Sequence, residues 1–492
     1  MGGSSSIRSV VWDPLNRRHF FNYFITILII IKIINCCDAY FYSEKKPATG
    51  DDRNCFCELK GSIDDCSCTI DTVDFFNNNK IYPRLKSLLV RDYFRFYKVN
   101  LKKDCPFWTD DSRCAMRSCH VSTCSETDVP EGLKGHHQQE TFVFKYLPES
   151  QHIDDCMRDH NLELSYLNKT LTQEAMHGFE IWADFDESQD NFCILDDHEN
   201  GAEYVDLLLN PERFTGYRGE SAHRIWDSIY LENCFDRTST NALLTHINKV
   251  PKHLKNLCME QRAFYRLLSG MHSSINIHLC SYYLLSEGTG LLSDPQGVWG
   301  KNTEEFMNRF SPETTKGEGP SWLKNLYFVY MLELRALAKA APFLRKEQFF
   351  TGNKDEDESV QAAVKDILNI IEAFPSHFNE SLMFNGTTSA QLKADFREKF
   401  RNISKIMDCV GCDKCKLWGK LQIQGLGTAL KILYSGKFEI EIDVPQQQPK
   451  SMKETLRQKF KLKRSEIVAL FNAFGRLSNS INLLEEFRKV TR

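Results

Sequence analysis

The sequence predicts a mainly α fold, with a single large helical domain and a cysteine-rich, loop-dominated N-terminal region. Apolar residues recur at helical spacing through most of the chain after about residue 200, and strand-like alternation is scarce. Hydrophobic residues make up 42% of the chain, which is enough for a large core. We expect a targeting segment at 1–39, a cysteine-rich region at 40–130 and a helical region at 131–492, with the last two forming one folded unit.

The N-terminal segment has the pattern of a secretory signal peptide. Arg17 and Arg18 precede an apolar run at 20–34, and small residues follow up to Ala39. Cleavage near Ala39 is expected. The alternative is an uncleaved signal anchor, which Lys32 and the short run disfavour. Four glycosylation sequons agree with a lumenal chain: Asn168, Asn379, Asn385 and Asn402.

The chain contains 18 cysteines, and two of them belong to the targeting segment. So many cysteines in a protein without metal indicate an oxidising compartment. A chain of 492 residues does not need disulfides to stabilise its core, so some of the cysteines are expected to do chemistry. The formal net charge of −4 provides no basic surface, which argues against a nucleic-acid partner.

The first cysteine group consists of two CxC units. Nested disulfides, Cys55–Cys68 and Cys57–Cys66, would close a compact structural unit. A zinc site is the alternative, but CxC spacing is tighter than the CxxC spacing that is usual for zinc. We favour structural disulfides.

The second group follows in a stretch with loop composition, and contains Cys105, Cys114, Cys119 and Cys124. In a mobile loop, the pair Cys114 and Cys119 could present a disulfide to an outside thiol. The alternative is a pair of further structural bridges, and spacing alone does not decide between these interpretations.

Helical periodicity predicts the main elements after the cysteine-rich region. The expected helices are at 258–285, 322–344, 360–374, 392–407, 417–434 and 465–490. The acidic run at 354–359 is expected to be a solvated loop. Residues 436–452, with two prolines, are expected to form a loop or short hairpin. Cys280 falls on an apolar helical face and is expected to be a buried thiol.

The segment Cys409-Val-Gly-Cys412-Asp-Lys-Cys415 carries the strongest chemical signal. An iron–sulfur cluster needs four cysteinates, and zinc lacks a histidine pair here. A redox dithiol fits better, because Lys414, Lys416 and a helix start near residue 417 would stabilise a thiolate on Cys412 or Cys415. Cys409 could then bridge back to the N-terminal region. We expect no metal.

A dithiol that makes disulfides must pass two electrons onward, and a flavin is the obvious relay. The Rossmann fingerprint is missing, since Gly425-Leu-Gly427 stands alone in a helical pattern. A flavin would therefore have to bind among helices.

Several longer motifs resemble the endoplasmic reticulum oxidoreductin family, which consists of FAD-dependent sulfhydryl oxidases. The resemblance runs from about Cys55 to the end of the chain. It is carried by the segments 210–217 (NPERFTGY), 224–226 (RIW), 232–235 (ENCF), 264–272 (FYRLLSGMH), 324–328 (KNLYF) and 409–412 (CVGC).

The resemblance implies roles for individual residues. Cys412–Cys415 would be the active-site disulfide, with Cys415 next to the flavin, and Cys114–Cys119 would be the shuttle pair. FAD contacts would be Arg213, Thr215, Trp226, Ser269, His272 and Arg335. Trp322 stands where some members have a further Arg contact, so that contact is not carried over.

The resemblance also implies disulfide pairings. Cys105–Cys409 and Cys234–Cys258 would be structural bridges. Cys114–Cys156 and Cys119–Cys124 would be regulatory bridges that compete for the shuttle cysteines.

The implied activity is re-oxidation of protein disulfide isomerase and related thioredoxin-fold proteins. Electrons would pass from the shuttle pair to the active-site pair, then to FAD and molecular oxygen, with hydrogen peroxide as the product. The implied location is the endoplasmic reticulum lumen, with peripheral association with the lumenal face of the membrane as a variant. The rival interpretation is a non-enzymatic, disulfide-rich lumenal binding protein. A thioredoxin-like isomerase is disfavoured because no βαβ pattern surrounds the CxxC.

Overall fold

The structure is a computed structural model of the full chain, and it describes a defined set of residues within it. These are 59–108, 119–134, 144–146, 191–212, 217, 220–232, 257–286, 298–374, 378–385, 389–434, 438–439, 459–460 and 462–491. All of them belong to one compact unit that spans Cys55–Arg492. The expected targeting segment at 1–39 lies outside the described residues.

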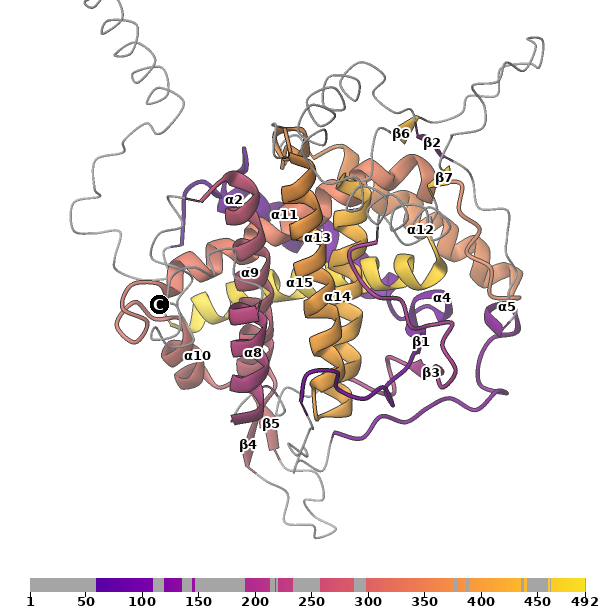
Figure 1. The fold of residues 1–492 in the computed structure, drawn as a ribbon, viewed down its shortest axis with the longest axis horizontal. Helices are drawn as coiled ribbons and strands as arrows, with labels where there is room; N and C mark the ends of the chain where they lie inside the picture. Colours follow the sequence, from indigo (N-terminus) through magenta and orange to yellow (C-terminus); the bar gives the residue numbers. More distant parts are fainter. Residues whose placement is uncertain are drawn as a thin grey trace, which may run out of the picture. The chain divides into compact units, whose positions relative to one another are not determined.

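Four long helices form the centre of this unit (Figure 1). They are α9 (Met259–Ser281), α11 (Gly319–Leu344), α14 (Asp413–Tyr434) and α15 (Arg464–Val490). Helix α14 packs closely on α15, and a Cβ at Gly425 would lie 2.3 Å from the carbonyl oxygen of Ala469. Helix α9 packs closely on α11, because Gly270 lies against the backbone of Asn325. Gly425 therefore serves helix packing.

The predicted helices after residue 258 are confirmed, with small shifts at their ends. Helix α13 (Ser389–Ile406) and α12 (Lys354–Glu372) complete the predicted set. The loop prediction for 354–359 is wrong, because these residues form the first turns of α12. Asn353 caps this helix by accepting hydrogen bonds from the backbone N–H groups of Asp355 and Glu356. Acidic side chains are favourable there, since the helix dipole places partial positive charge at this end.

Shorter helices surround the four central ones. Two of them are α8 (Glu220–Glu232), which packs on α13, and α10 (Thr303–Phe310), which packs on α9 and α11. The described part of the cysteine-rich region also contains short helices, of which α2 and α3 contact α15. They are α2 (Ile70–Phe76), a π-helical segment (Asn77–Ile81), α3 (Tyr82–Leu88), α4 (Asp92–Arg95) and α5 (Glu131–Lys134).

The strands are short and form three small antiparallel sheets. Strand β1 (Phe96–Val99) pairs with β3 (Glu203–Asp206), so that Phe96 lies opposite Asp206. A three-stranded sheet has the order β6 (Phe438–Glu439), β2 (Phe144–Tyr146), β7 (Lys459–Phe460). Strand β4 (Tyr283–Ser286) pairs with β5 (Val298–Gly300). Only β6 of the expected loop or hairpin at 436–452 is described.

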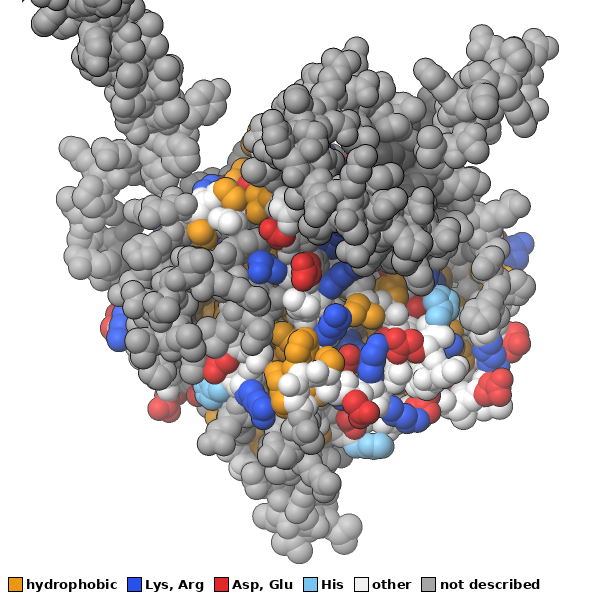
Figure 2. All heavy atoms as spheres, in the orientation of Figure 1, with side chains coloured by type: hydrophobic (Ala, Val, Ile, Leu, Met, Phe, Trp, Pro, Cys, Tyr) orange, Lys and Arg blue, Asp and Glu red, His pale blue; other side chains and the backbone are white. Residues whose placement is uncertain are grey.

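The surface is mixed in charge. Figure 2 shows Lys and Arg side chains interspersed with Asp and Glu side chains over the described part of one face. Among the helices of the described residues, none combines the length and apolar character needed to cross a bilayer.

Candidate active site

The candidate redox cysteines lie at the N-terminus of α14. A 3₁₀ turn (Met407–Cys409) ends at Cys409, Cys412 lies just before α14, and Cys415 lies in its first turn. The side chains of Cys412 and Cys415 are buried, with exposed fractions of 4% and 1%. The positive end of the helix dipole stabilises negative charge on a thiolate at this position. The local structure therefore suits a reactive dithiol.

Two disulfides join this turn to the cysteine-rich region. Cys105 is bonded to Cys409 across a sequence separation of 304 residues. The tether that the family resemblance implied is thus confirmed. Cys119 is bonded to Cys412 across a separation of 293 residues. One cysteine of the expected shuttle pair therefore contacts one cysteine of the expected active-site pair directly.

The segment around Cys119 is held against α14 and β3 by backbone hydrogen bonds. The N–H of Lys414 donates to the carbonyl of Cys119 at 2.9 Å, and the N–H of Cys124 donates to the carbonyl of Tyr204 at 2.8 Å. The buried side chain of Asn210 donates to the carbonyl of Ser122 and accepts from its N–H, both at 2.8 Å. These contacts fix the position of Cys119 against α14, the helix that carries Cys415 and is called the redox helix below.

The Cys119–Cys412 bond takes the place of the disulfide expected between Cys412 and Cys415, which is not formed in the structure. It also means that Cys119 is not bonded to Cys124, because one sulfur holds only one disulfide partner. Cys124 is a thiol. Thiol–disulfide exchange proceeds through mixed disulfides. The observed bond is the mixed disulfide that exchange between the two expected pairs would form.

Cys66 and Cys258 are thiols in the structure, so the expected bridges Cys57–Cys66 and Cys234–Cys258 are not formed there. The expected pairings Cys55–Cys68, Cys114–Cys119 and Cys114–Cys156 each involve a cysteine outside the described residues, so they stay predictions. The cysteines outside the described residues are Cys55, Cys57, Cys114, Cys156 and Cys234. Cys280 is a buried thiol on α9, as predicted, and burial raises its pKa to about 12.

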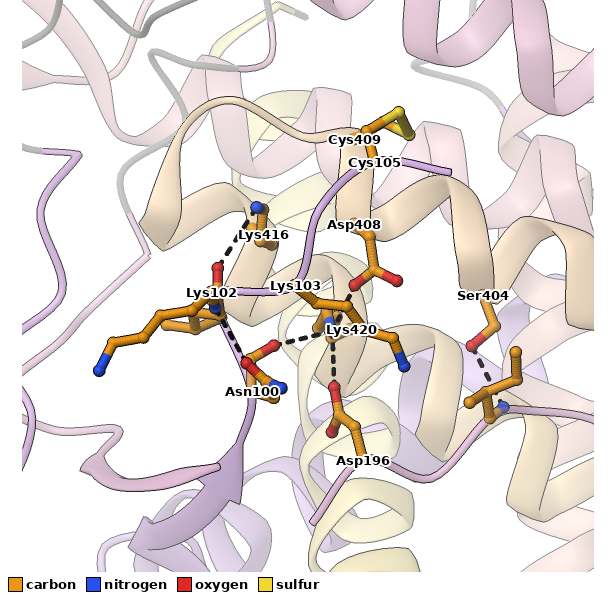
Figure 3. Close-up of polar contacts among 12 residues, drawn as sticks. Asn100, Lys102, Lys103, Cys105, Asp196, Ser404, Asp408, Cys409, Lys416 and Lys420 are labelled. Atoms are coloured by element: carbon orange, nitrogen blue, oxygen red, sulfur yellow. Dashed lines mark hydrogen bonds and ion pairs between the residues drawn. A yellow bond between two sulfur atoms is a disulfide. The ribbon is translucent and has the colours of Figure 1, made fainter. Parts of the chain in front are cut away.

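A buried polar cluster lies beneath the Cys105–Cys409 bridge (Figure 3). The ammonium of Lys420 on α14 lies 2.6 Å from a carboxylate oxygen of Asp196 and 2.6 Å from one of Asp408. It also donates to the carbonyl of Asn100 at 2.9 Å. Because Asp408 precedes Cys409, this cluster connects the redox helix, the tether and the chain leading from β1. No sequence signal pointed to Lys420.

Two of the expected flavin contacts form an aromatic stack. The rings of Trp226 on α8 and His272 on α9 have centroids 3.8 Å apart and planes 11° apart. Burial, with help from Arg309 and His223, lowers the pKa of His272 to about 3, so its ring is neutral. A neutral, half-buried pair of flat rings offers the kind of surface on which a further aromatic ring stacks.

Ser269 and Arg335 occupy different levels of the α9–α11 pair. The hydroxyl of Ser269 accepts a hydrogen bond from Asn325 at 2.9 Å. Arg335 lies farther along α11 than Asn325, by about 15 Å at the helical rise of about 1.5 Å per residue. Its guanidinium donates two hydrogen bonds of 2.8 Å to Glu380. Arg335 would have to leave Glu380, or share its donors, in order to hold a phosphate.

These observations test whether the described residues fit FAD. The stack of Trp226 and His272 fits an aromatic ring system, and the hydroxyl of Ser269 is a suitable polar partner nearby on the same helix face. The guanidinium of Arg335 has the right chemistry for phosphate. The remaining expected contacts, Arg213 and Thr215, lie outside the described residues. The described part of the set therefore fits.

A further group beside Cys415 was not singled out from the sequence. The hydroxyl of Tyr217 lies 2.9 Å from a carboxylate oxygen of Glu212 and 3.3 Å from the carbonyl oxygen of Cys415. Arg476 of α15 donates to the same Glu212 oxygen at 2.6 Å. Glu212 and Tyr217 both belong to the segment 210–217 that carries the family resemblance, so the signal was present in the sequence.

The described sequons differ in exposure. Asn379 and Asn385 are exposed, whereas Asn402 is half-buried on α13. The fourth, Asn168, lies outside the described residues. Glycosylation stays a prediction at all four positions.

Fold and site define a class of protein: a helical oxidoreductase that acts on disulfides. The family model described as Endoplasmic Reticulum Oxidoreductin 1 (ERO1) matches residues 80–484. The chain belongs to this family, and it is an oxidoreductase that acts on disulfides.

Individual relatives agree with this assignment. An Ero1-like protein of Drosophila melanogaster is 56% identical over 476 residues, covering 95% of this chain and 97% of the relative. ERO1-like protein alpha of Homo sapiens is 47% identical over 464 residues, covering 91% and 94%. A solved structure of S. cerevisiae Ero1p, carrying two cysteine-to-alanine changes, matches with a TM-score of 0.51 at 30% identity. It covers 86% of this chain and 97% of that chain.

Proposed function

We propose that this protein is an FAD-dependent thiol oxidase of the endoplasmic reticulum lumen that re-oxidises protein disulfide isomerase. The Cys119–Cys412 disulfide is the observation that carries the proposal. A binding protein stabilised by disulfides has no need for a bond between a loop cysteine and one member of a CxxC pair at a helix N-terminus. An oxidoreductase that transfers electrons between two dithiols forms this bond in each turnover.

The exchange steps follow from the positions of the cysteines. A partner dithiol reduces Cys114–Cys119, and the partner leaves with a disulfide. The thiolate of Cys119 attacks Cys412, which breaks Cys412–Cys415 and forms the mixed disulfide. Cys114 then attacks Cys119, re-forms the shuttle disulfide and releases Cys412 as a thiolate.

Residues of the helical core are proposed to bind the cofactor that takes two electrons from the active-site pair. Bound FAD would supply the two-electron chemistry that links these thiols to molecular oxygen, with hydrogen peroxide as the product. Trp226 and His272 would hold an aromatic ring of the cofactor, and Ser269 and Arg335 would hold its polar parts. Arg213 and Thr215 are proposed to complete this set.

Oxygen consumption with two substrates tests the proposal. In the variant C412A/C415A, oxygen consumption should stop with reduced protein disulfide isomerase and with dithiothreitol alike. In C114A/C119A it should stop with the isomerase but continue with dithiothreitol, since a small thiol reaches the inner pair without the shuttle. A matched control is C280A, which removes a buried thiol from α9 and should leave both rates intact.

Two outcomes would contradict the proposal. A colourless, folded protein without flavin absorbance would support the disulfide-rich binding protein instead. If C114A/C119A lost oxygen consumption equally with the isomerase and with dithiothreitol, this would contradict a shuttle role for Cys114 and Cys119.

A further inference from the structure

Glu212, Tyr217 and Cys415 form a short chain of contacts that ends at the redox helix. Among the described residues, two oxygen atoms lie within reach of the Tyr217 hydroxyl, 2.9 Å away on Glu212 and 3.3 Å away on the Cys415 backbone. A tyrosine hydroxyl carries one proton, so it donates to one of these acceptors at a time. The choice between them depends on whether Glu212 is protonated.

The two protonation states give two arrangements. An ionised Glu212 accepts the Tyr217 proton, and the Cys415 carbonyl loses that donor. A protonated Glu212 donates to the Tyr217 oxygen, and Tyr217 then donates to Cys415. The protonation of a carboxyl group is thereby coupled to a residue of the active-site pair.

The surroundings hold Glu212 close to the balance between these states. Its side chain is 8% exposed, and that of its ion-pair partner Arg476 is 5% exposed. Burial opposes the charged form, whereas Arg476 and Tyr217 favour it, and the outcome raises the pKa of Glu212 to about 7. The imidazole of His278 on α9 is hydrogen-bonded to the backbone carbonyl of Arg476. Burial lowers the pKa of His278 to about 3, so this imidazole is neutral.

We propose that Glu212 is a proton-holding positioning residue for the redox pair and acts on Cys415 through the hydroxyl of Tyr217. When Cys119 attacks Cys412, the electron pair of the Cys412–Cys415 bond leaves with the sulfur of Cys415. The proton given up by the Cys119 thiol is balanced by one taken up at Glu212.

The charge balance is the physical reason for this coupling. One thiol, one disulfide and one carboxylate become one mixed disulfide, one thiolate and one carboxylic acid. The buried site keeps a single negative charge, which moves from Glu212 to Cys415. A second buried anion within this chain of contacts would be costly, because repulsion between like charges is strong at low dielectric. The structure holds the Cys119–Cys412 product of this step.

The equilibrium between the full-length protein and dithiothreitol tests the coupling without relying on oxidase activity. The oxidised fraction of Cys412–Cys415 is measured by acid quenching, alkylation and peptide mass spectrometry from about pH 6 to about pH 8. The ratio of the equilibrium constant for reduction in the wild type to that in E212Q should fall as pH rises. One linked proton changes it by up to about tenfold per pH unit.

The variants separate a proton role from a structural one. Y217F keeps the Glu212–Arg476 ion pair but removes the hydroxyl that contacts Cys415. The wild-type to Y217F ratio should therefore fall as pH rises, as the wild-type to E212Q ratio does. The matched control is E347Q, which replaces another glutamate whose pKa burial raises to about 7. Its ratio to the wild type should stay constant with pH.

A ratio that does not change with pH for E212Q, or that changes equally for E347Q, overturns the inference. This inference rests on the proposed thiol oxidase function, but the experiments distinguish failure of the inference from failure of the proposed function. Loss of the proposed function would appear as unchanged oxygen consumption in C412A/C415A. Failure of the inference would appear as a flat ratio in a protein whose oxygen consumption depends on that pair.

Discussion

Cys119 and Cys412 are separated by 293 residues in the sequence and share a disulfide at the N-terminus of α14. The bond joins a segment that runs along β3 to the helix whose first turn carries Cys415. The backbone bond from Lys414 to the Cys119 carbonyl supports the same contact independently of the sulfur atoms. The arrangement therefore brings Cys119 of the expected shuttle pair into direct contact with Cys412 of the expected active-site pair.

The Cys105–Cys409 tether should stabilise the fold as well as the site. In the chain-entropy description, closing a loop of this size contributes about 5 kcal/mol, and other bridges that shorten the loop reduce this value. C105A and C409A should therefore each lower the thermal unfolding midpoint by several degrees. The double variant C105A/C409A should behave like either single variant, since each already removes the whole bond. Additive losses would show that the thiols matter separately from the bridge.

The Lys420 cluster should be sensitive to the loss of its cation. K420M leaves Asp196 and Asp408 as buried carboxylates without their ammonium partner, which typically costs about 3–5 kcal/mol. We expect a large drop in the free energy of unfolding and slower electron transfer, because Asp408 adjoins Cys409. The triple variant D196N/K420M/D408N removes all three charges and should recover a substantial part of the stability. No recovery in the triple variant would contradict a charge-pairing role.

The Trp226–His272 stack should contribute to flavin retention. W226A removes one aromatic face, and losing one such contact costs about 1 kcal/mol, which corresponds to roughly fivefold weaker binding. Flavin stoichiometry and the dissociation rate of FAD measure this directly. W226F should retain most of the binding. H278Q alters a buried histidine of the same helix that lies outside the stack, and it should retain flavin fully.

Acid should destabilise the protein partly through its buried histidines. Burial lowers the pKa of His278 from 6.5 to about 3, so below pH 6.5 the unfolded chain binds a proton that the folded chain refuses. Its contribution to stability is therefore complete above pH 6.5 and is lost as pH falls toward 3, with a slope of up to about 1.4 kcal/mol per pH unit. H278Q should reduce the slope of unfolding free energy between these limits. Replacement of the exposed His120 is the control, and an equal effect there would contradict the assignment.

The sequence predicted the helical core and the tether better than it predicted the polar contacts. Helices α9, α11 and α15 have uninterrupted apolar periodicity, so local spacing was sufficient. The run at 354–359 was misassigned because acidic residues suit both a solvated loop and a helix N-terminus, and only the capping Asn353 distinguishes them. These signals are local, whereas the site depends on distant contacts.

The site was predictable only in part for that reason. Cys409 and Cys412 were placed by their motif and the family resemblance. Lys420 could not be recognised, because Asp196 lies on a segment that joins it only in the folded chain. Glu212 lies in the segment 210–217 that carries the family resemblance. Its proposed role depends on Arg476 of α15, and no local sequence pattern connects the two residues.

The central claim is that electrons pass between the pairs through a bond of Cys119 to Cys412. The most direct measurement is non-reducing peptide mapping of C114S, in which Cys412 and Cys415 are intact, after acid quenching. In this variant the Cys119 thiol attacks the Cys412–Cys415 disulfide and Cys415 leaves as the thiolate. Because the variant lacks the Cys114 thiol that resolves the mixed disulfide, the peptide linking Cys119 to Cys412 should accumulate. Absence of that peptide, or accumulation of Cys119 joined to another cysteine, would contradict the account.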